Sequence, residues 1–256
     1  PVEDPSNPGQ ICVDAQGHMT LADHSTPNNQ YATMQPGHIY TIVGNPSWDP
    51  SRTPNDGTGR WFGQYADSDG LPAQEAKLDQ PDGLAYDNNT GNLYIADYDN
   101  QRVRVVNIND GIIHTFAGNP PLTGADAAPS YGQRGNGSTL DYDYVPGTSG
   151  LGGPATQAQL AYPRGLALDK SGRLYIADTA SGRILMVGTD HTLSDVAGRV
   201  HDPNALNAPI DDFSDGDALN WADLFETQYL SVDKDGNLVF ADLRHERVRK
   251  VWRQWE

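Results

Sequence analysis

The chain has 256 residues, a formal net charge of −17 at pH 7, a hydrophobic content of 37%, 27 glycines and 18 prolines. Such an acidic surface opposes binding to nucleic acid or to anionic lipid, because phosphate recognition needs clustered lysine and arginine. No apolar run approaches the roughly 18 residues of a membrane-spanning helix, so no membrane insertion is predicted. The single cysteine, Cys12, excludes an intrachain disulfide and a thiolate metal cluster.

A sequence unit occurs four times along the chain. The clearest copies read QPDGLAYD…NLYIADYDNQRVRVV…GIIHTFAG and YPRGLALD…RLYIADTASGRILMV…HTLSDVAG. The last copy reads TQYLSVD…NLVFADLRHERVRKV, and the first is degenerate. The units span about residues 7–44, 80–118, 162–198 and 227–256. Because a unit of this size cannot bury its own apolar face, we expect the units to stack in a single domain over residues 1–256.

Each unit is predicted to hold short β-strands in a fixed order. The first strand ends on an aspartate in Ile11–Asp14, Leu84–Asp87, Leu166–Asp169 and Leu230–Asp233. After a glycine-containing turn, the second strand covers Met19–Asp23, Leu93–Asp97, Leu174–Asp178 and Leu238–Asp242. The third strand opens on Arg102, Arg183 or Arg247, and the fourth covers His38–Val43, Ile112–Ala117 and Thr192–Ala197. Four antiparallel strands per unit predict an all-β fold made of β-propeller blades.

Two units depart from this order. The first has Pro27-Asn28-Asn29-Gln30 where the arginine is expected, so its third strand is uncertain. The last stops at Glu256, fourteen residues past Asp242, which leaves the last blade without its fourth strand. Two kinds of arrangement fit about equally: a compact four-bladed ring with one defective sheet, or a part of a larger propeller or an assembly in which a partner chain covers the exposed strand edge.

Connectors with a shared ending precede the units. They read DGLPAQEAKLDQP, GGPATQAQLAYP and DGDALNWADLFETQ, and the spacing of alanine and leucine predicts a short helical turn in each. Long inter-blade loops cover residues 46–65, 120–150 and 200–213. Long loops on a rigid scaffold are common places for binding residues.

These motifs resemble the NHL repeat: a P-x-G-[LV]-A-x-D opening, then LYIAD, N-x-R-[IV]-R and a closing T-x-A-G. The connectors are similar to those of exported bacterial NHL-repeat proteins. The resemblance implies a β-propeller of four-stranded antiparallel blades. It also implies an extracytoplasmic protein, whether secreted, periplasmic or at the cell surface.

The most regular charged feature is an aspartate that closes the second strand and an arginine five residues later. It could form a ring of acids and bases around a channel. We favour a structural role, because the pair recurs in every regular blade whatever the neighbouring loops contain. The pairs are Asp97/Arg102, Asp178/Arg183 and Asp242/Arg247.

Acidic loops raise the possibility of a Ca²⁺ site, since carboxylates at alternating positions beside glycine suit this cation. Ordinary turns share the same composition and are the favoured interpretation. The residues concerned are Asp67, Asp69, Asp211, Asp215 and Asp217.

The seven histidines form no metal-binding pair of the H-x-x-x-H type. NHL-like amidating lyases hold Zn²⁺ with histidines from several blades, which leaves a zinc site at His24 or His114 as a minor alternative. No catalytic residue is predicted.

Aromatic residues of the long loops and of the C-terminus are the candidate contacts for a ligand or partner. They can form sugar platforms or protein contacts, or they can pin the loops onto the propeller. They are Trp48, Trp61, Phe62, Tyr65, Tyr131, Tyr142, Tyr144, Trp252 and Trp255.

The sequence therefore predicts a non-catalytic extracytoplasmic binding or scaffold module of a larger assembly, which contacts protein or glycan and takes a partner or further chain at its C-terminal blade edge. The alternative is a metal-dependent propeller lyase or hydrolase with a site in its central channel.

Overall fold

The structure is a computed structural model. It describes residues 11–13, 19–22, 31–33, 41–44, 69–98, 100–107, 110–119, 149–199, 219, 222, 224, 226–243 and 245–252. The chain divides into two compact units. The first holds residues 1–78, 86–93 and 104–115, and the second holds residues 79–85, 94–103 and 116–256.

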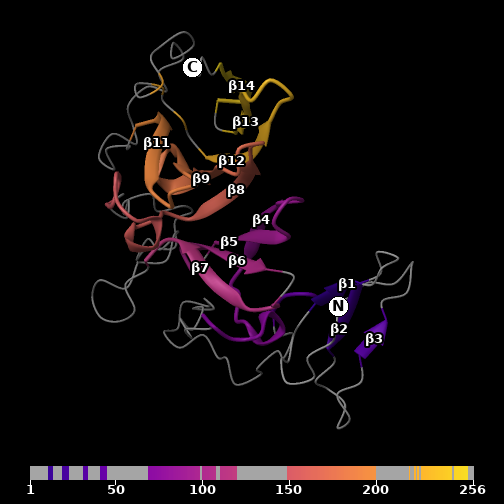
Figure 1. The fold of residues 1–256 in the computed structure, drawn as a ribbon. Coiled ribbons are helices and arrows are strands. Elements are labelled where there is room, and N and C mark those ends of the chain that lie inside the picture. Colours follow the sequence, from indigo (N-terminus) through magenta and orange to yellow (C-terminus); the bar gives the residue numbers. More distant parts are fainter. Residues whose placement is uncertain are drawn as a thin grey trace. The chain divides into compact units, whose positions relative to one another are not determined.

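The described strands form antiparallel sheets in which sequence neighbours pair in order (Figure 1). One three-stranded sheet contains β1 (Ile11–Val13), β2 (Met19–Ala22) and β3 (Tyr31–Thr33). A four-stranded sheet contains β4 (Pro81–Tyr86), β5 (Asn92–Asp97), β6 (Arg102–Asn107) and β7 (Ile113–Ala117). We call the next one the central sheet: β8 (Pro163–Leu168), β9 (Leu174–Asp178), β10 (Arg183–Val187) and β11 (Leu193–Gly198). The C-terminal sheet contains β12 (Thr227–Val232), β13 (Leu238–Asp242) and β14 (Arg247–Val251). These are β-propeller blades, so the predicted all-β fold is confirmed.

The first strand of each regular unit begins three residues earlier than predicted and stops before its aspartate. In the central sheet, Asp169 lies just after β8, and its carboxylate accepts hydrogen bonds from the backbone N–H groups of Ser171 and Arg173. Asp87 and Asp233 accept from residues two positions on in the same way. The repeated aspartate therefore shapes the hairpin turn, because its side chain replaces a backbone acceptor there.

The degenerate first unit does contain a third strand. β3 pairs with β2 although it lacks the arginine of the other units. The predicted fourth strand of this unit is not found at Thr41–Val43, and its other residues lie outside the described part. The C-terminal sheet has three strands in the described part of the chain, as predicted.

Two of the three connectors contain the predicted helical turn, as 3₁₀-helices η1 (Ala73–Glu75) and η2 (Ala155–Gln157), and the third connector lies mostly outside the described residues. The alanines that follow, Ala76 and Ala158, are fully buried. The glycine that closes each repeat donates its backbone N–H to this turn, from Gly44 to Ala73 and from Gly118 to Ala155.

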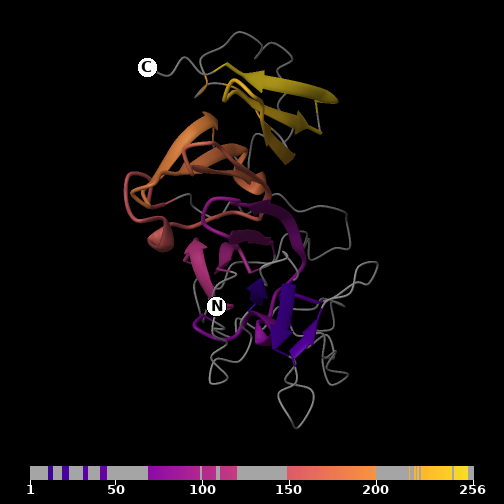
Figure 2. The ribbon, with the colours of Figure 1, turned by 45° about the vertical axis from the view of Figure 1, so that its right-hand side comes forward.

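One core lies between the central and C-terminal sheets (Figure 2). The central sheet contributes Ala167, Tyr175, Ile184 and Ala197, with Met186 packed at the side. The C-terminal sheet contributes Leu238, Phe240 and Val251, with Leu230 and Val232 at the side. Alternation along each strand puts these residues on one face, as the period of two requires.

The motif glycine of the first strand lets neighbouring sheets approach. A Cβ atom on Gly83 would lie 2.0 Å from the carbonyl oxygen of Arg164, and one on Gly165 would lie 2.3 Å from that of Gln228. Neither distance leaves room for a side chain, so the repeat needs glycine here for close backbone approach.

Candidate interaction site on the C-terminal sheet

The aspartates that close the second strands of the three regular units, Asp97, Asp178 and Asp242, are fully buried, and the first two accept hydrogen bonds from backbone groups. Asp97 accepts the N–H of Asp79 at 2.7 Å, and Asp178 accepts the N–H of Ala161 at 2.6 Å. Both donors occupy the same connector position, two residues before a first strand. The repeated aspartate thus fixes the entry of the chain into its own blade.

The predicted arginine partners lie opposite these aspartates in the strand register. Arg183 pairs in register with Asp178, and Arg247 with Asp242. Ion pairs also run to other groups: Arg183 approaches Asp195 at 3.6 Å, and Asp242 accepts from Arg249 at 3.1 Å. The structural role of the aspartate is therefore broader than the predicted pair, and the pairing with Arg102, Arg183 and Arg247 stays a prediction.

Burial raises the pKa of Asp178 to about 6, against the lowering effects of hydrogen bonds and of the positive charge on Arg183. Desolvation penalises the carboxylate form, and the hydrogen bonds from Ser181 and from the backbone of Ala161 do not fully offset this penalty.

The C-terminal sheet holds a buried polar network around Asp242. Nδ1 of His245 lies 2.9 Å from Oδ1 of Asp242, and Arg249 contacts the other carboxylate oxygen. At the equivalent of His245, the other blades have Asn100, which donates to Asp97, and Ser181. The histidine therefore fills a recurrent structural position.

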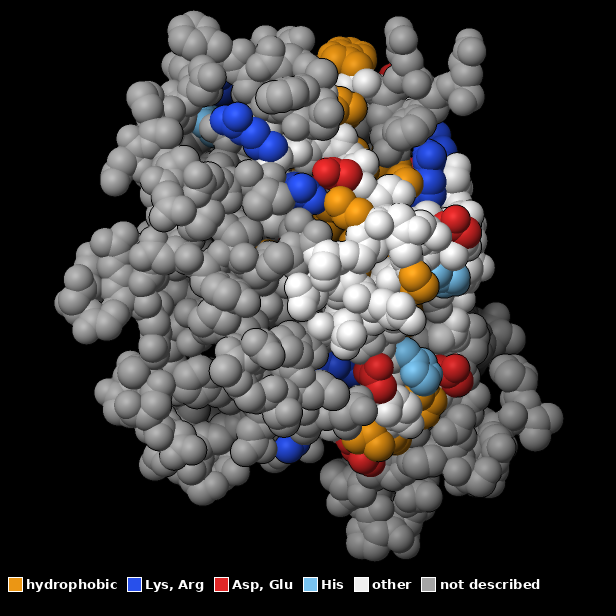
Figure 3. All heavy atoms as spheres, turned by 90° about the vertical axis from the view of Figure 1, so that its left-hand side faces the viewer, with side chains coloured by type: hydrophobic (Ala, Val, Ile, Leu, Met, Phe, Trp, Pro, Cys, Tyr) orange, Lys and Arg blue, Asp and Glu red, His pale blue; other side chains and the backbone are white. Residues whose placement is uncertain are grey.

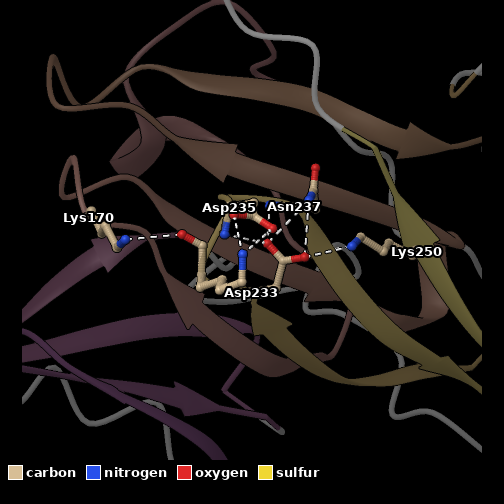
Figure 4. Close-up of polar contacts among 6 residues, drawn as sticks. Lys170, Asp233, Asp235, Asn237 and Lys250 are labelled. Atoms are coloured by element: carbon tan, nitrogen blue, oxygen red, sulfur yellow. Dashed lines mark hydrogen bonds and ion pairs between the residues drawn. The ribbon is translucent and has the colours of Figure 1, made fainter.

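The turn between β12 and β13 is held by Asp233 (Figure 4). Its carboxylate accepts from the backbone of Asp235 and Asn237 and pairs with Nζ of Lys250 at 2.7 Å. The bond from Lys250, followed by that from Asn237, lowers the pKa of Asp233. Lys170, on the neighbouring sheet, donates to the carbonyl oxygen of Lys234 at 3.0 Å.

The predicted Ca²⁺ ligands are only partly described. Asp69 accepts from Nη2 of Arg104 at 2.6 Å and from the backbone and hydroxyl of Thr115. No group of three potential metal ligands occurs among the described residues. Asp67, Asp211, Asp215 and Asp217 lie outside them, so the calcium site stays a prediction.

One face of the C-terminal sheet carries large exposed apolar side chains. Tyr229 on β12 is 64% exposed, Val248 on β14 is 78% exposed, and Trp252 just after β14 is 73% exposed. Between Val248 and Trp252, Lys250 points the same way, with Nζ 3.8 Å from the centre of the Trp252 ring. Its charge is also paired with Asp233. We call this the C-terminal face: Tyr229, Ser231, Val239, Ala241, Val248, Lys250 and Trp252.

The same face of the central sheet is covered. The residues equivalent to Ser231, Val239 and Val248 are Ala167, Tyr175 and Ile184, and all three belong to the core beneath the C-terminal sheet. Ile184 is fully buried, whereas Val248 is largely exposed. Ile184 and Val248 hold the same place in the repeat, and their exposure differs because the central sheet is covered by a neighbouring sheet on this side.

Among the predicted contact residues, only Trp252 is described, and it lies on the C-terminal face. The other aromatic residues lie outside the described part: Trp48, Trp61, Phe62, Tyr65, Tyr131, Tyr142, Tyr144 and Trp255. Of the zinc candidates, His114 is exposed on β7, and His24 is not described. In the view of Figure 3, apolar, basic, acidic and histidine side chains of the described residues reach the surface in small groups.

Tyr229 and Val248 were missed by the sequence analysis. For Tyr229 the signal was present, because TQYLS stands where the other units have PDGLA and PRGLA. Val248 gave no signal, since RVRKV reads like any other third strand.

A family model described as NHL repeat matches residues 78–106 and 160–185. These matches cover the end of a connector and the first three strands in two successive blades. The chain contains NHL repeats. The repeat glycines Gly83 and Gly165 and the aspartates Asp97 and Asp178 all fall within the matched segments.

The chain is similar to segments of two teneurins. It is 28% identical to Teneurin-m of Drosophila melanogaster in an alignment 252 residues long, which covers 95% of this chain and 8% of that protein. It is 31% identical to Teneurin-3 of Danio rerio in an alignment 236 residues long, which covers 74% of this chain and 9% of that protein. The chain thus spans less than a tenth of the length of these relatives.

Among solved structures, one described as an auxiliary nutrient binding protein from Bacteroides thetaiotaomicron aligns with 65% of this chain and 36% of its own. The TM-score is 0.42 and the sequence identity is 10%. At these values the likeness carries no conclusion about activity.

Among the described residues, no helix has the length and apolar character needed to cross a bilayer.

Proposed function

We propose that this NHL-repeat chain is a non-catalytic binding and scaffold module of a larger extracytoplasmic assembly, and that it takes a protein strand at the edge of its C-terminal sheet. The observation that carries the proposal is the number of strands. In the described residues, β14 is the last strand of its sheet, whereas β10, its equivalent in the central sheet, pairs with a fourth strand, β11.

An unpaired strand presents a row of backbone donors and acceptors, which an extended segment can complete by strand addition. The central sheet supplies the pattern for such a segment. β11 runs antiparallel to β10 and pairs Leu193 with Val187 at one end and Gly198 with Arg183 at the other. We therefore propose an antiparallel partner strand of about six residues on β14.

The side chains of β14 indicate the chemistry of this partner. β14 reads Arg-Val-Arg-Lys-Val, which is a basic strand in a chain of net charge −17. In the central sheet, Asp195 of the fourth strand lies 3.6 Å from Arg183. Because Arg247 occupies the place of Arg183, a partner strand with a carboxylate at the position of Asp195 suits this edge.

The test uses the fourth strand of the central sheet as a probe. A fluorescent peptide with the sequence of residues 192–199 is titrated with the chain, and fluorescence anisotropy reports binding. We expect saturable binding, and no binding by the same peptide with proline in place of Asp195, because proline removes a ladder donor and disturbs the strand.

The matched control is a variant of the chain in which an appended segment of its own pairs with the edge of β14. The five residues 188–192 join β10 to β11, and the five residues 252–256 follow β14. The sequence of residues 193–199 appended after Glu256 therefore places a fourth strand in register. This extended variant should no longer bind the peptide, because the attached strand is present at high effective concentration. Binding that is unaffected by the proline or by the appended strand contradicts the proposal.

The loops at 46–65 and 120–150 are the proposed second contact, for protein or glycan. Trp61→Ala and Tyr142→Ala should each weaken retention on a glycan or protein array without changing the melting temperature. An equal loss of melting temperature would instead indicate that these aromatic residues pin the loops. Fractionation of the source cells tests the extracytoplasmic location.

A further inference from the structure

The turn between β4 and β5 is one residue longer than its counterparts in the other two regular blades. The backbone N–H of Asp87 donates to the carbonyl oxygen of Asn92, whereas those of Asp169 and Asp233 donate to carbonyl oxygens one position nearer in the sequence. The longer turn holds the sequence Asn-Asn-Thr at residues 88–90, and all three residues are exposed. It belongs to a different blade from the β14 edge, so it is a separate site.

Residues 88–90 form an acceptor sequence for N-linked glycosylation, which requires asparagine, any residue except proline, and then serine or threonine. The carboxylate of Asp87 fixes the turn around it. One oxygen accepts the N–H of Asn89 at 2.9 Å, and the other accepts the hydroxyl of Thr90 at 2.7 Å. Asn88 is thus held in an exposed turn, where a bulky polar group can be attached without displacing buried side chains.

The residue two positions before Asn88 is aromatic and exposed. Tyr86 is the last residue of β4 and is 46% exposed, and its equivalents in the other regular blades are Leu168 and Val232. One face of a sugar ring consists mainly of C–H groups, which pack well on an aromatic ring. Tyr86 therefore offers an apolar platform beside the point where a sugar would be attached.

We propose that Asn88 is an acceptor site for an N-linked glycan, and that Tyr86 packs against the first sugar of this glycan. The inference rests on the proposed extracytoplasmic location, because glycans of this kind are added during export. It adds a modification site on a turn that the proposed binding surfaces do not use.

The reaction is a group transfer without oxidation or reduction. The donor is an oligosaccharide carried on a lipid pyrophosphate. The side-chain nitrogen Nδ2 of Asn88 forms a bond to the anomeric carbon of the first sugar and loses one proton, while the bond from that carbon to the pyrophosphate oxygen breaks and the lipid pyrophosphate leaves with the electron pair. The acceptor sequence needs the hydroxyl of Thr90, which the folded turn already donates to Asp87. Transfer should therefore precede folding of the hairpin.

The test secretes the 256-residue chain from cultured animal cells behind a cleavable leader. Asn136→Gln is included, because residues 136–138 form a second acceptor sequence. The tryptic peptide of residues 78–102 is treated with peptide N-glycosidase in H₂¹⁸O and sequenced by mass spectrometry. We expect residue 88 to be read as ¹⁸O-labelled aspartate in most of the chain. Secreted chain in which Asn88 stays unlabelled overturns the proposal.

Two variants of Thr90 separate the acceptor sequence from the stability of the turn. Thr90→Ala should lower the occupancy of Asn88 about tenfold or more, because it removes the required hydroxyl. Thr90→Ser retains a hydroxyl that both the acceptor sequence and Asp87 can use, so it should keep most of the glycan. Labelling at residue 88 that is the same in both variants contradicts the assignment.

The platform role of Tyr86 is measured by the effect of the glycan on stability. The melting temperature of the secreted chain is compared with that of the same chain made without the leader, which stays in the cytosol and receives no glycan. The glycan should raise the melting temperature by about 2 °C, because the sugar covers exposed apolar surface. In Tyr86→Ala the two forms should melt together. An equal increase in both chains, or no increase in either, removes the role of Tyr86.

This proposal and the proposed function fail separately, because the leader supplies export whatever the natural location is. An unmodified Asn88 in the secreted chain contradicts the glycan alone. A modified Asn88 together with a cytosolic location in the source cells contradicts the extracytoplasmic assembly alone. Binding of the peptide at β14 is measured on chain without a glycan and decides neither.

Discussion

At the scale of single residues, the buried carboxylates connect the two ends of each blade. Asp97 and Asp178 hold the backbone of the connector that leads into the first strand of their own sheet. A hydrogen bond to a charged acceptor contributes about 1.5–3 kcal/mol. For Asp178 this gain is opposed by complete burial, which raises its pKa to about 6. One side chain therefore fixes the connector and makes the stability of the blade depend on pH.

Asp178→Asn should change the pH dependence of stability. Because the pKa of Asp178 is about 6 in the folded chain and ordinarily 3.8, the folded state binds more protons between these pH values. Asp178 therefore makes the free energy of unfolding fall as pH rises through this window, by up to about 3 kcal/mol. The asparagine variant still offers an oxygen to Ala161 but should lack this fall. Urea unfolding between about pH 4 and pH 7 measures it, and the exposed Asp235→Asn is the control. If the free energy of unfolding depends on pH in the same way for Asp178→Asn and for the unmodified chain, Asp178 is not the group that causes the fall.

Asp69 and Arg104 form an ion pair at positions that are apolar in the next blade. Gly70 and Gly152 make equivalent backbone bonds, which aligns Asp69 with Leu151, and Arg104 takes the place of Leu185. Arg104 is fully buried. Asp69→Leu should therefore lower the free energy of unfolding by about 3 kcal/mol, because it leaves a buried charge without its carboxylate.

The double variant Asp69→Leu/Arg104→Leu should recover most of this loss, since both side chains then match the apolar pair of the central blade. Chemical denaturation of the two single variants and the double variant gives the coupling energy. Additive losses would show that the two side chains do not act as a pair.

At the scale of elements, the contact between successive first strands sets how closely two blades pack. Gly165 provides it between β8 and β12, and Gly83 provides it between β4 and β8. Leu238 and Phe240 then fill the space between the central and C-terminal sheets. The packing of side chains between blades therefore depends on backbone approach at one position of the repeat.

Gly165→Ala should destabilise the chain by about 2 kcal/mol or more, because the new methyl group would overlap the carbonyl oxygen of Gln228. Gly236→Ala is the matched control: its φ of +85° is unfavourable for alanine, but nothing lies within 4 Å of the new atom. We expect a cost of about 1 kcal/mol for the control from backbone strain alone. Thermal unfolding followed by circular dichroism compares the two. An equal loss of stability in the two variants would mean that β8 and β12 can move apart without cost to accommodate the methyl group.

At the scale of the whole molecule, the net charge of −17 favours solubility and opposes the compact state through self-repulsion. The described ion pairs hold only part of this charge. The basic residues that they use include Arg104, Arg249 and Lys250, which are paired with Asp69, Asp242 and Asp233.

Raising the KCl concentration from about 10 mM to about 300 mM should therefore raise the melting temperature at pH 7, because screening weakens repulsion among unpaired carboxylates. Scanning fluorimetry measures this change. The same series with CaCl₂ at matched ionic strength tests the predicted calcium site, which requires a larger increase than KCl gives. A melting temperature that falls with KCl would show that the ion pairs outweigh the repulsion.

The sequence by itself determined the strands, their turns and their assembly into sheets, because these depend on neighbours a few residues apart. The carboxylates of Asp169 and Asp233 shape the turns by accepting backbone N–H groups a few residues later, and the alternation in LYIAD and LVFAD places Tyr175 and Val239 on the same side of their sheets. Only the tertiary structure decided which of these sides is covered. Ile184 and Val248 have the same local pattern, yet one is buried and the other is exposed. The reason is that burial of a sheet face depends on a second sheet from elsewhere in the chain, and no local period encodes its presence.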